Sequence, residues 1–221
     1  MLETIIKMWN KYSYVYISGL TGTLCLAAIT VLCGTLIGIV LAVMRLSRVK
    51  PLQWFVRFYV WVLRGTPILL QLYFFWIFLP RITGINIPDS TCIIIALIVN
   101  ASSYVAEVIR AGIQAVDKGQ TEAARSLGMT GVHTMTRIIL PQAVKNILPA
   151  LGNEFITMIK QASLASVFFI NELTTSYKTV ASATFRQVES IIIAGLIYLL
   201  VTTVLGRILA LVEWRMNANE R

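Results

Sequence analysis

The stretch between Lys11 and Arg45 contains no charged residue, and no other feature constrains the fold as strongly. A helix rises about 1.5 Å per residue, and about 20 apolar residues are enough to cross a hydrocarbon core of about 30 Å. The run from Leu20 to Met44 can therefore span a bilayer with some tilt. Residues 1–16, which precede it, carry the tyrosines and tryptophan typical of a membrane–water boundary. We expect an integral membrane protein.

The composition of the chain supports a membrane location. Of its 221 residues, 57% are hydrophobic and 13% are charged, with a mean hydropathy of +0.76, whereas soluble domains are about one quarter charged. The net charge of +9 does not indicate nucleic-acid binding, because the basic residues lie mostly between apolar runs. The three cysteines have no paired spacing and His133 is the only histidine, so we expect neither a metal site nor a catalytic site.

The fold class that we predict is an all-α membrane protein with five transmembrane helices. These spans run from Leu20 to Met44, from Trp54 to Leu79 with an interruption at Arg64–Pro67, from Cys92 to Gly112, from Asn146 to Ile170, and from Ser190 to Val212. A turn-rich loop is expected at Pro80–Thr91, and residues 171–189 are polar and mixed in charge. The whole chain, residues 1–221, is expected to form one transmembrane domain with a loop at about 113–145.

The distribution of basic residues predicts the orientation of these spans. The segments that follow spans one, three and five carry Arg45, Arg48, Lys50, Lys118, Arg125, Arg137, Lys145, Arg215 and Arg221. The other side carries Lys7, Lys11, Arg81, Lys178 and Arg186. Lysine and arginine accumulate on the cytoplasmic side of membrane proteins. We therefore expect the N-terminus outside, and the C-terminus and the loop at 113–145 in the cytoplasm.

The longest polar and basic interval lies within that loop, from Glu122 to Pro141. Gln120 and Thr121 offer a helix start, and Gly128 offers a left-handed stop about two turns later. Thr130 can cap a second short helix, and Pro141 is expected to prevent a simple continuation of it. The predicted product is a compact two-helix unit whose outward alanine face would let another protein approach closely.

The spacing within this interval carries a resemblance. Glu122-Ala123-Ala124 is followed after three intervening residues by Gly128, after nine more by Ile138, and after one more by Leu140-Pro141. This pattern resembles the cytoplasmic loop of the membrane subunits of ABC importers. The segments Arg64-Gly65-Thr66-Pro67 and Tyr104-Val105-Ala106-Glu107 narrow the resemblance to polar amino-acid permeases, and it covers nearly the whole chain.

The resemblance implies a permease subunit in a bacterial cell membrane, with a coupling helix that sits in a cleft of a separate ATPase. The residues expected to contact the ATPase are Glu122, Ala123, Ala124, Leu127 and Gly128. This chain has no Gly-x4-Gly-Lys-Ser/Thr phosphate loop, so no cofactor is expected in it, and ATP and Mg²⁺ would bind the partner ATPase. The other implied partners are a second permease subunit, identical or sister, an extracytoplasmic solute-binding protein, and the polar amino-acid substrate within the lipid bilayer.

Two alternatives stay open at this point. An ion-coupled secondary transporter would also use charged groups inside the membrane, but it would leave the Glu122–Pro141 pattern without a function. A non-transporting anchor could recruit a cytoplasmic protein through the same loop, but the polar residues that lie along one face of three of the spans argue against it. The sequence leaves open which amino acid is carried and whether this subunit itself holds a substrate.

Polar residues inside the predicted spans are the candidates for substrate binding, since a charge at mid-span costs roughly 2.5–3.5 kcal/mol. Arg64, Asn100, Glu154 and Lys160 lie about 12–21 Å from the cytoplasmic helix ends, near the middle of the bilayer. Helical spacing places other polar residues on the same faces. The expected substrate-binding residues are Arg64, Thr66, Gln71, Asn100, Tyr104, Glu154, Lys160 and Gln161.

An amino-acid zwitterion needs an acidic and a basic site close together. Glu154 would meet the ammonium group. Lys160 would meet the carboxylate, or else a helix start with Thr66 as its cap and Pro67 as its first residue would do so. In related permeases the position after Lys160 is often acidic, whereas here it is Gln161, which argues against a cationic substrate side chain. The alternative for Arg64 is a structural pair with Glu107 that holds two helices together.

Overall fold

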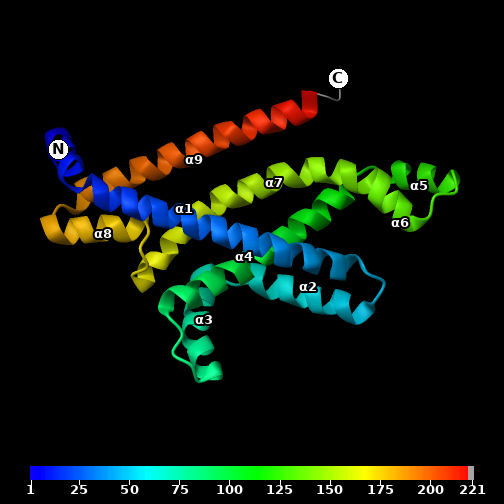
Figure 1. Cartoon of the computed structure of the whole chain (residues 1–221), viewed down its shortest axis with the longest axis horizontal. Helices are drawn as coiled ribbons and strands as arrows, with labels where there is room; N and C mark the ends of the chain where they lie inside the picture. The colour runs from blue at the N-terminus through cyan, green and yellow to red at the C-terminus, as the bar shows by residue number, and fades with distance from the viewer. Residues whose placement is uncertain (219–221) are drawn as a thin grey trace.

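The computed structural model describes residues 1–218, and its regular elements are helices (Figure 1). They are α1 (Leu2–Leu46), α2 (Lys50–Gly65), α3 (Ile68–Thr83), α4 (Asp89–Gln114), α5 (Lys118–Ser126), α6 (Gly131–Thr134), the π-helix η1 (Met135–Ile139), α7 (Leu140–Gln161), the 3-10 helix η2 (Ala162–Phe168), α8 (Leu173–Thr184) and α9 (Gln187–Ala218). Arg221, which entered the charge count, lies outside the described residues.

Three described helices, α1, α4 and α9, are long and apolar enough to cross a membrane, and α2 with α3 adds a fourth if that bent pair counts as one span. The all-helical membrane fold is therefore confirmed. Helices α4 and α9 extend beyond the expected spans at both ends. The segment expected as span four divides into α7 and η2, because the α-helix ends at Gln161 and continues as a 3-10 helix.

Helix α1 contains 45 residues, a length of about 68 Å. The expected span from Leu20 to Met44 is only its C-terminal part, since residues 2–19 continue the same helix without a break. Met8 and Tyr16 explain this continuation, because they are buried in an apolar cluster with Leu173 of α8 and Ile193 of α9. Tertiary packing thus extends the helix beyond the uncharged run.

Small residues bring α1 and α4 close together. A Cβ atom at Gly34 would lie 2.9 Å from the Cβ of Ala101, and one at Gly38 would lie 2.6 Å from Val105 Cγ1. Helices in lipid gain little from hydrophobic burial, so they associate through close packing of small residues such as these. Helix α4 is consequently the most enclosed of the candidate spans, with 61% of its apolar window buried against 17% for α9.

The interruption expected at Arg64–Pro67 is a sharp bend of 110° between α2 and α3. Two details differ from the expectation. Thr66 does not cap α3, because its hydroxyl donates back to the carbonyl of Val62. Pro67 is the N-cap residue and not the first helical residue. Helix α3 then continues through Pro80 to Thr83 and ends at Gly84 in the left-handed conformation, so the loop before α4 is shorter than expected.

Pro141 does not prevent the continuation of the second short helix, which corrects the expectation. Helix α6, η1 and α7 follow one another without a break. The π-helix register makes this possible, because the amide of Leu140 donates to the carbonyl of Met135, five residues earlier. Pro141 lies in the first turn of α7, directly after the π-helix, where its missing N–H is tolerated.

Helix α8 lies in the polar segment 171–189, where no helix was expected. The fully buried Glu172 begins it, because its carboxylate accepts hydrogen bonds from the backbone amides of Thr174 and Thr175. The hydroxyl of Tyr198 on α9 donates to the same carboxylate at 3.0 Å. Glycines let α8 approach α1, since a Cβ at Gly19 would lie 2.0 Å from the hydroxyl oxygen of Ser176.

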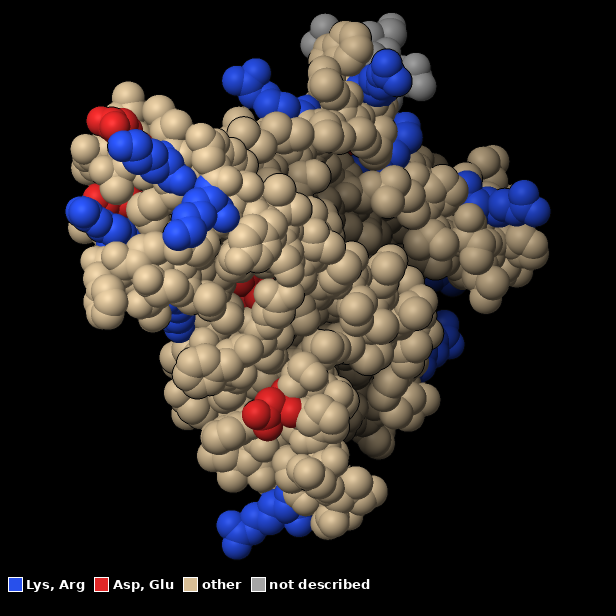
Figure 2. All heavy atoms as spheres, turned by 60° about the vertical axis from the view of Figure 1, so that its left-hand side comes forward, with Lys and Arg blue, Asp and Glu red and all other residues tan. Residues whose placement is uncertain are grey.

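Different helices lie at the two ends of the molecule. The N-terminus and α8 lie at one end of the long axis, whereas α5, α6 and the C-terminal part of α9 lie towards the other (Figure 1). On the face shown in Figure 2, charged side chains gather mainly around the edges and leave a broad uncharged surface between them. This is the distribution expected of a helical protein that sits in a bilayer.

Candidate functional site: a polar cluster beside the helix bend

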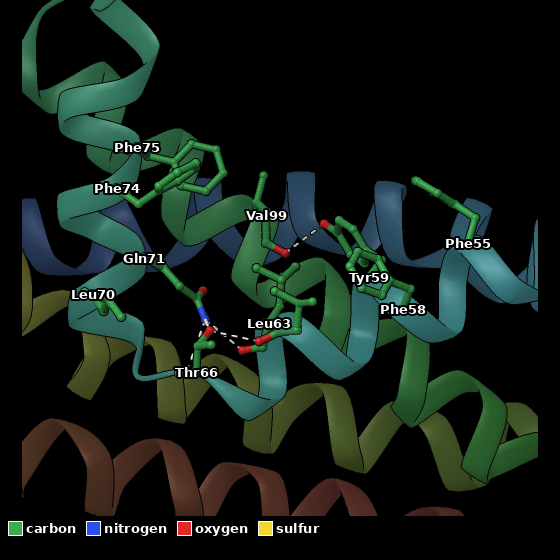
Figure 3. Close-up of a pocket in the computed structure, with 11 residues that line it drawn as sticks. Phe55, Phe58, Tyr59, Leu63, Thr66, Leu70, Gln71, Phe74, Phe75 and Val99 are labelled. Carbon is green, nitrogen blue, oxygen red and sulfur yellow. Dashed lines mark hydrogen bonds between the residues drawn. The ribbon is translucent and has the colours of Figure 1, made fainter.

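The polar cluster centres on Gln71 in the first turn of α3, which is only 6% exposed. Its amide nitrogen donates to the carbonyl of Leu63 at 2.8 Å, and to the hydroxyl and carbonyl oxygens of Thr66 at 2.8 and 3.1 Å (Figure 3). The amide oxygen of Gln71 accepts from Asn100 Nδ2 at 2.9 Å. A single side chain therefore fastens the end of α2, the start of α3 and the middle of α4 together.

Three of the predicted substrate-binding residues keep a buried oxygen without a hydrogen-bond partner in the described part of the chain. These atoms are Asn100 Oδ1, Glu154 Oε1 and Gln161 Oε1. Buried polar atoms are nearly always paired in folded proteins. Each of these acceptors, on α4 or α7, therefore needs a donor that the described residues do not supply, such as water, a substrate or another subunit.

A second polar group surrounds Glu107 on α4. Its carboxylate binds Arg110 of the same helix, and it also lies 3.4 Å from Arg45 Nη1 on α1 and 3.7 Å from Arg64 Nη1 on α2. The Arg64 guanidinium also lies 5.2 Å from the ring centre of Tyr104. The arginine–glutamate pair considered from the sequence therefore exists, and it belongs to a cluster of three arginines around one carboxylate.

The structure thus brings together most of the residues that the sequence nominated. Thr66, Gln71 and Asn100 form one hydrogen-bonded group, and Arg64 with Tyr104 forms part of the neighbouring group. Glu154 on α7 is close enough to Arg64 for a long-range electrostatic interaction, but no hydrogen bond or ion pair among the described residues joins it to either group. Lys160 and Gln161 lie together at the junction of α7 and η2, and no hydrogen bond or ion pair among the described residues connects either of them with the other candidates.

Sequence reasoning missed several members of these groups. The sequence indicated Arg45 only as a marker of orientation, and it did not single out Arg110. Tyr59 on α2 was also missed, although its hydroxyl donates to the carbonyl of Val99 and lies 2.7 Å from the hydroxyl of Ser102. The available signal was helical spacing, because Ser103, Glu107 and Arg110 lie on one face of α4.

An apolar cavity of about 450 Å³ lies beside the cluster, in the angle between α2 and α3. Its walls are aromatic, with Phe55, Phe58 and Tyr59 from α2 and Phe74 and Phe75 from α3 (Figure 3). Polar groups reach it only at the bend, where Thr66 and Gln71 contribute to its lining. This cavity suits hydrocarbon or apolar side chains and does not suit a free amino acid.

The predicted coupling segment forms two short helices, as expected, but α5 begins at Lys118 and not at Gln120. Asp117 is its cap, with a side chain that accepts from the amide of Gly119. The expected stop at Gly128 is confirmed by its φ of +81°. The amides of Gly128 and Met129 donate to the carbonyls of Arg125 and Ala124, a pairing that closes a helix end.

The side chains of this segment divide between two faces. Ala124 is 5% exposed and packs within the chain, so it does not belong to an outward alanine face. Glu122, Ala123 and Leu127 are exposed, and Leu127 reaches 84%. Ala123 and Leu127 are four residues apart and so share one face. An apolar face of this kind, at the polar end of a membrane protein, suits contact with another protein.

The family of the chain follows from comparison with known proteins. Residues 34–218 match the family described as binding-protein-dependent transport system inner membrane component. The chain belongs to this family. Its members are the membrane permease subunits of ABC importers, and they work with a separate ATPase, a second permease subunit and a solute-binding protein. The family is thus the one that the loop pattern indicated, and the chain is a transporter subunit and not an enzyme.

Curated relatives match this chain over nearly their full length. The chain is 38% identical to the arginine transport system permease protein ArtQ of Bacillus subtilis, over 92% of this chain and 93% of the relative. It is 37% identical to the nopaline transport system permease protein NocM of Agrobacterium fabrum, over 100% of this chain and 93% of the relative. The putative glutamine transport system permease protein GlnP of Rickettsia conorii is 36% identical, over 99% of this chain and 100% of the relative.

Solved structures support the same conclusion. A chain from the crystal structure of an amino acid ABC transporter with histidines matches at a TM-score of 0.89 and 47% identity, over 93% of this chain and 95% of that chain. The methionine ABC transporter MetNI, in an inward-facing conformation, matches at a TM-score of 0.73 over 92% of this chain and 96% of that chain. Its sequence identity is 16%, so it supports the fold alone. Membership in this family decides against an ion-coupled secondary transporter and against a non-transporting anchor.

Proposed function

We propose that this permease carries a polar amino acid across a bacterial plasma membrane, driven by ATP that a partner subunit binds and hydrolyses. The observation that supports a polar substrate is the presence of buried acceptors on α4 and α7 without a partner among the described residues, together with the partly exposed Arg64. The names of the relatives support it, since ArtQ, NocM and GlnP are named for the transport of arginine, nopaline and glutamine.

In this proposal the chain crosses the membrane five times, with the N-terminus outside. The crossings are α1, the bent pair α2–α3, α4, α7 with η2, and α9. The end of α1, the coupling segment and the end of α9 then lie on the cytoplasmic side. The arrangement in Figure 1 supports this, because α5 and α6 lie at the end opposite the N-terminus and α8.

The substrate would meet the chain between α4 and α7. Glu154 would accept hydrogen bonds from the substrate ammonium through the oxygen that has no partner among the described residues. Arg64, whose side chain is 42% exposed, would attract the substrate carboxylate while it keeps Glu107 as a counter-ion. Asn100 and Gln161 each offer one further acceptor. Lys160 remains a candidate by its position after Glu154 on α7.

The coupling segment would transmit the movement of the ATPase. In the proposal Ala123 and Leu127 sit in a cleft of the ATPase, with Glu122 beside them. Because α6, η1 and α7 run on without a break, a displacement of α6 would pass directly to the helix that carries Glu154. The same rigid path would return the signal of a bound substrate to the ATPase.

Glu154→Gln tests the substrate site, because it keeps the size of the side chain and removes its charge. The loss of a desolvated charged hydrogen bond costs about 1.5–3 kcal/mol, a drop in affinity of roughly ten- to a hundredfold. We expect weaker uptake at low substrate concentration by proteoliposomes that contain the whole complex, with normal assembly. Wild-type uptake affinity in a well-assembled Glu154→Gln complex would remove Glu154 from the site.

A further inference from the structure

A second cavity lies at the end of the molecule that carries α5 and α6 (Figure 1). Its volume is about 500 Å³, and small-molecule sites usually have about 300–1,000 Å³. The walls come from the end of α4, the link between α4 and α5, α5 itself and the π-helix η1. A membrane helix and both parts of the coupling segment therefore meet around one cavity that the proposed transport function does not use.

The cavity lies on the side of α5 that faces the rest of the chain. Thr121, which contributes to the lining, is half-buried and stands three residues before the buried Ala124. Residues three apart share one face of a helix. Ala123 and Leu127, which are proposed to contact the ATPase, are exposed on the other face. The cavity is therefore distinct from the surface proposed for the ATPase.

The polar groups in the lining are hydrogen-bond donors that lack partners. Lys118 Nζ and Thr121 Oγ1 form no hydrogen bond or ion pair with the described residues. The side-chain oxygen of Gln114 accepts from Arg110, so its amide nitrogen is the group that remains free. Among the described residues that line this cavity, none is acidic. A set of free donors without a carboxylate suits an anion.

The position of Lys118 is a separate indication of an anion. It is the first residue of α5, and the first turn of that helix contains no acidic residue. The start of a helix carries partial positive charge, so a lysine is disfavoured there and an anion is favoured. The neighbouring carboxylate of Asp117 accepts from the amide of Gly119 and forms no ion pair with Lys118 among the described residues. A bound anion would stabilise this otherwise unfavourable charge.

The rest of the lining is apolar. It consists of Met135 and Ile139 from η1, Ile113 from the end of α4, and Val116 from the link. Met135 and Ile139 are the first and last residues of the π-helix, a rare turn that is frequent at functional sites. An apolar wall beside a cation matches a carboxylate with a short hydrocarbon chain. A zwitterionic amino acid is a poor match, because the lining offers no carboxylate to its ammonium group.

We propose that this cavity binds a small organic carboxylate with an apolar chain, held by Lys118, Thr121 and Gln114, and that the bound molecule regulates the transporter. The ligand would contact α4, α5 and η1 together, so it would bind best while these elements keep their present arrangement. A ligand that prefers one arrangement shifts the population towards it. The bound carboxylate would therefore hold the coupling segment against α4 and lower ATP hydrolysis by the complex. Only this effect on ATP hydrolysis, and not the binding, rests on the proposed function.

Fluorine NMR of trifluorohexanoate, fluorinated at its terminal methyl group, measures binding to the complete complex in lipid nanodiscs, with empty nanodiscs as the background. We expect saturable binding of this acid and none of the neutral trifluorohexanamide. Lys118→Gln should weaken binding about tenfold, the effect of losing one charged hydrogen bond. Lys50→Gln, at another exposed lysine, should not weaken it. Absence of saturable binding, or equal affinity of the two variants, would overturn the site.

A matched pair of valines tests the location of the site. Val116→Phe places a larger side chain in the cavity, and Val49→Phe, at an exposed valine in the link between α1 and α2, is the control. With both variants assembled at wild-type levels, Val116→Phe should abolish the binding of trifluorohexanoate and Val49→Phe should keep the wild-type affinity. Equal affinity of the two variants would show that the acid binds elsewhere.

Substrate-stimulated ATP hydrolysis by the same complexes tests the regulation. Added hexanoate should lower the rate in the wild type and in Lys50→Gln, and it should leave the rate of Lys118→Gln unchanged at concentrations that saturate the wild type. Saturable binding without any change in ATP hydrolysis would overturn the regulatory role. A complex whose ATP hydrolysis responds to no amino acid would count against the proposed function instead, and the NMR measurements would still decide whether the site exists.

Discussion

The polar cluster and the coupling segment are both rich in polar residues, yet they are built in opposite ways. In the cluster the side chains bind one another and nearby backbone, as Gln71 binds the side chains of Thr66 and Asn100 and the carbonyl of Leu63. In the coupling segment the helix ends are fixed by hydrogen bonds, while side chains between them point outward, with Leu127 84% exposed. The hydrogen bonds of the polar cluster hold three helices together, whereas the exposed side chains of the coupling segment remain available to a partner protein.

This difference separates two kinds of mutational effect. Substitutions in the cluster should first lower the stability of the chain, because they leave buried groups unpaired. Substitutions on the outward face of the coupling segment should leave stability unchanged, since exposed positions without such contacts usually change it by less than about 0.5 kcal/mol. The effect on stability should therefore fall from the centre of the cluster to the outward face of α5.

Glu107→Gln should have the largest effect. The carboxylate balances Arg45, Arg64 and Arg110, and its side chain is 21% exposed. Breaking a fully buried ion pair costs about 3–5 kcal/mol, and we expect about 2–3 kcal/mol here because water still reaches the group. Thermal unfolding of the purified protein and its level in the membrane measure the loss.

Arg64→Gln is the comparison within the same cluster. Its side chain is 42% exposed and its contact with Glu107 is 3.7 Å, so solvent screening should hold the loss below about 1 kcal/mol. A loss as large as that of Glu107→Gln would show that Arg64 is the main structural partner of the carboxylate, and it would contradict the role proposed for Arg64 in attracting the substrate carboxylate.

The sequence predicted the elements of the cluster better than their connections. The position of the helix interruption was evident from Gly65 and Pro67, whose conformational effects are local. Its angle was not, because the angle depends on Gln71 reaching back to Leu63 across the bend. Likewise, the charge of Arg45 indicated orientation, but its contact with Glu107 depends on how closely α1 and α4 pack.

The missed elements have a similar cause. Helix α8 lies in a polar segment, and it is fixed by the buried Glu172 and by glycines of α1 that are distant in sequence. The π-helix before Pro141 was missed because standard helix rules treat an interior proline as a stop. In contrast, the stop at Gly128 was predicted correctly, since a left-handed residue at a helix end is a local preference.

Gln71→Leu should have the second-largest effect. Leucine has a similar volume, but it leaves Asn100 Nδ2 and the carbonyl of Leu63 without the partners that Gln71 supplies. Unpaired buried groups cost about 1–3 kcal/mol, and the bend between α2 and α3 should loosen. Thermal unfolding measures the cost, and Thr83→Val, at an exposed hydroxyl further along α3, is the control. Unchanged stability in Gln71→Leu would show that the bend does not depend on this residue.

Gly128→Ala should have a smaller effect, confined to the end of α5. The residue has a φ of +81°, and a side chain in the left-handed region costs roughly 1–2 kcal/mol. Gly131→Ala, also exposed but with no positive φ, is the matched control. Hydrogen exchange at the amides of Gly128 and Met129, which close the helix, should be faster in Gly128→Ala alone. Equal protection in the two variants would contradict the role of Gly128 as the helix stop.

Leu127→Gln should have the smallest effect on stability and a large effect on coupling. The leucine is 84% exposed, so its loss should change the free energy of unfolding by less than about 0.5 kcal/mol. If it fills a cleft of the ATPase, however, the complex should lose substrate-stimulated ATP hydrolysis, because a buried apolar anchor is often worth about 2 kcal/mol, or roughly thirtyfold in binding. Val188→Gln, at the opposite end of the molecule and 60% exposed, is the control for a general loss of surface apolarity. Full substrate-stimulated ATPase activity in the Leu127→Gln complex would show that the ATPase does not contact the face of α5 that carries Leu127.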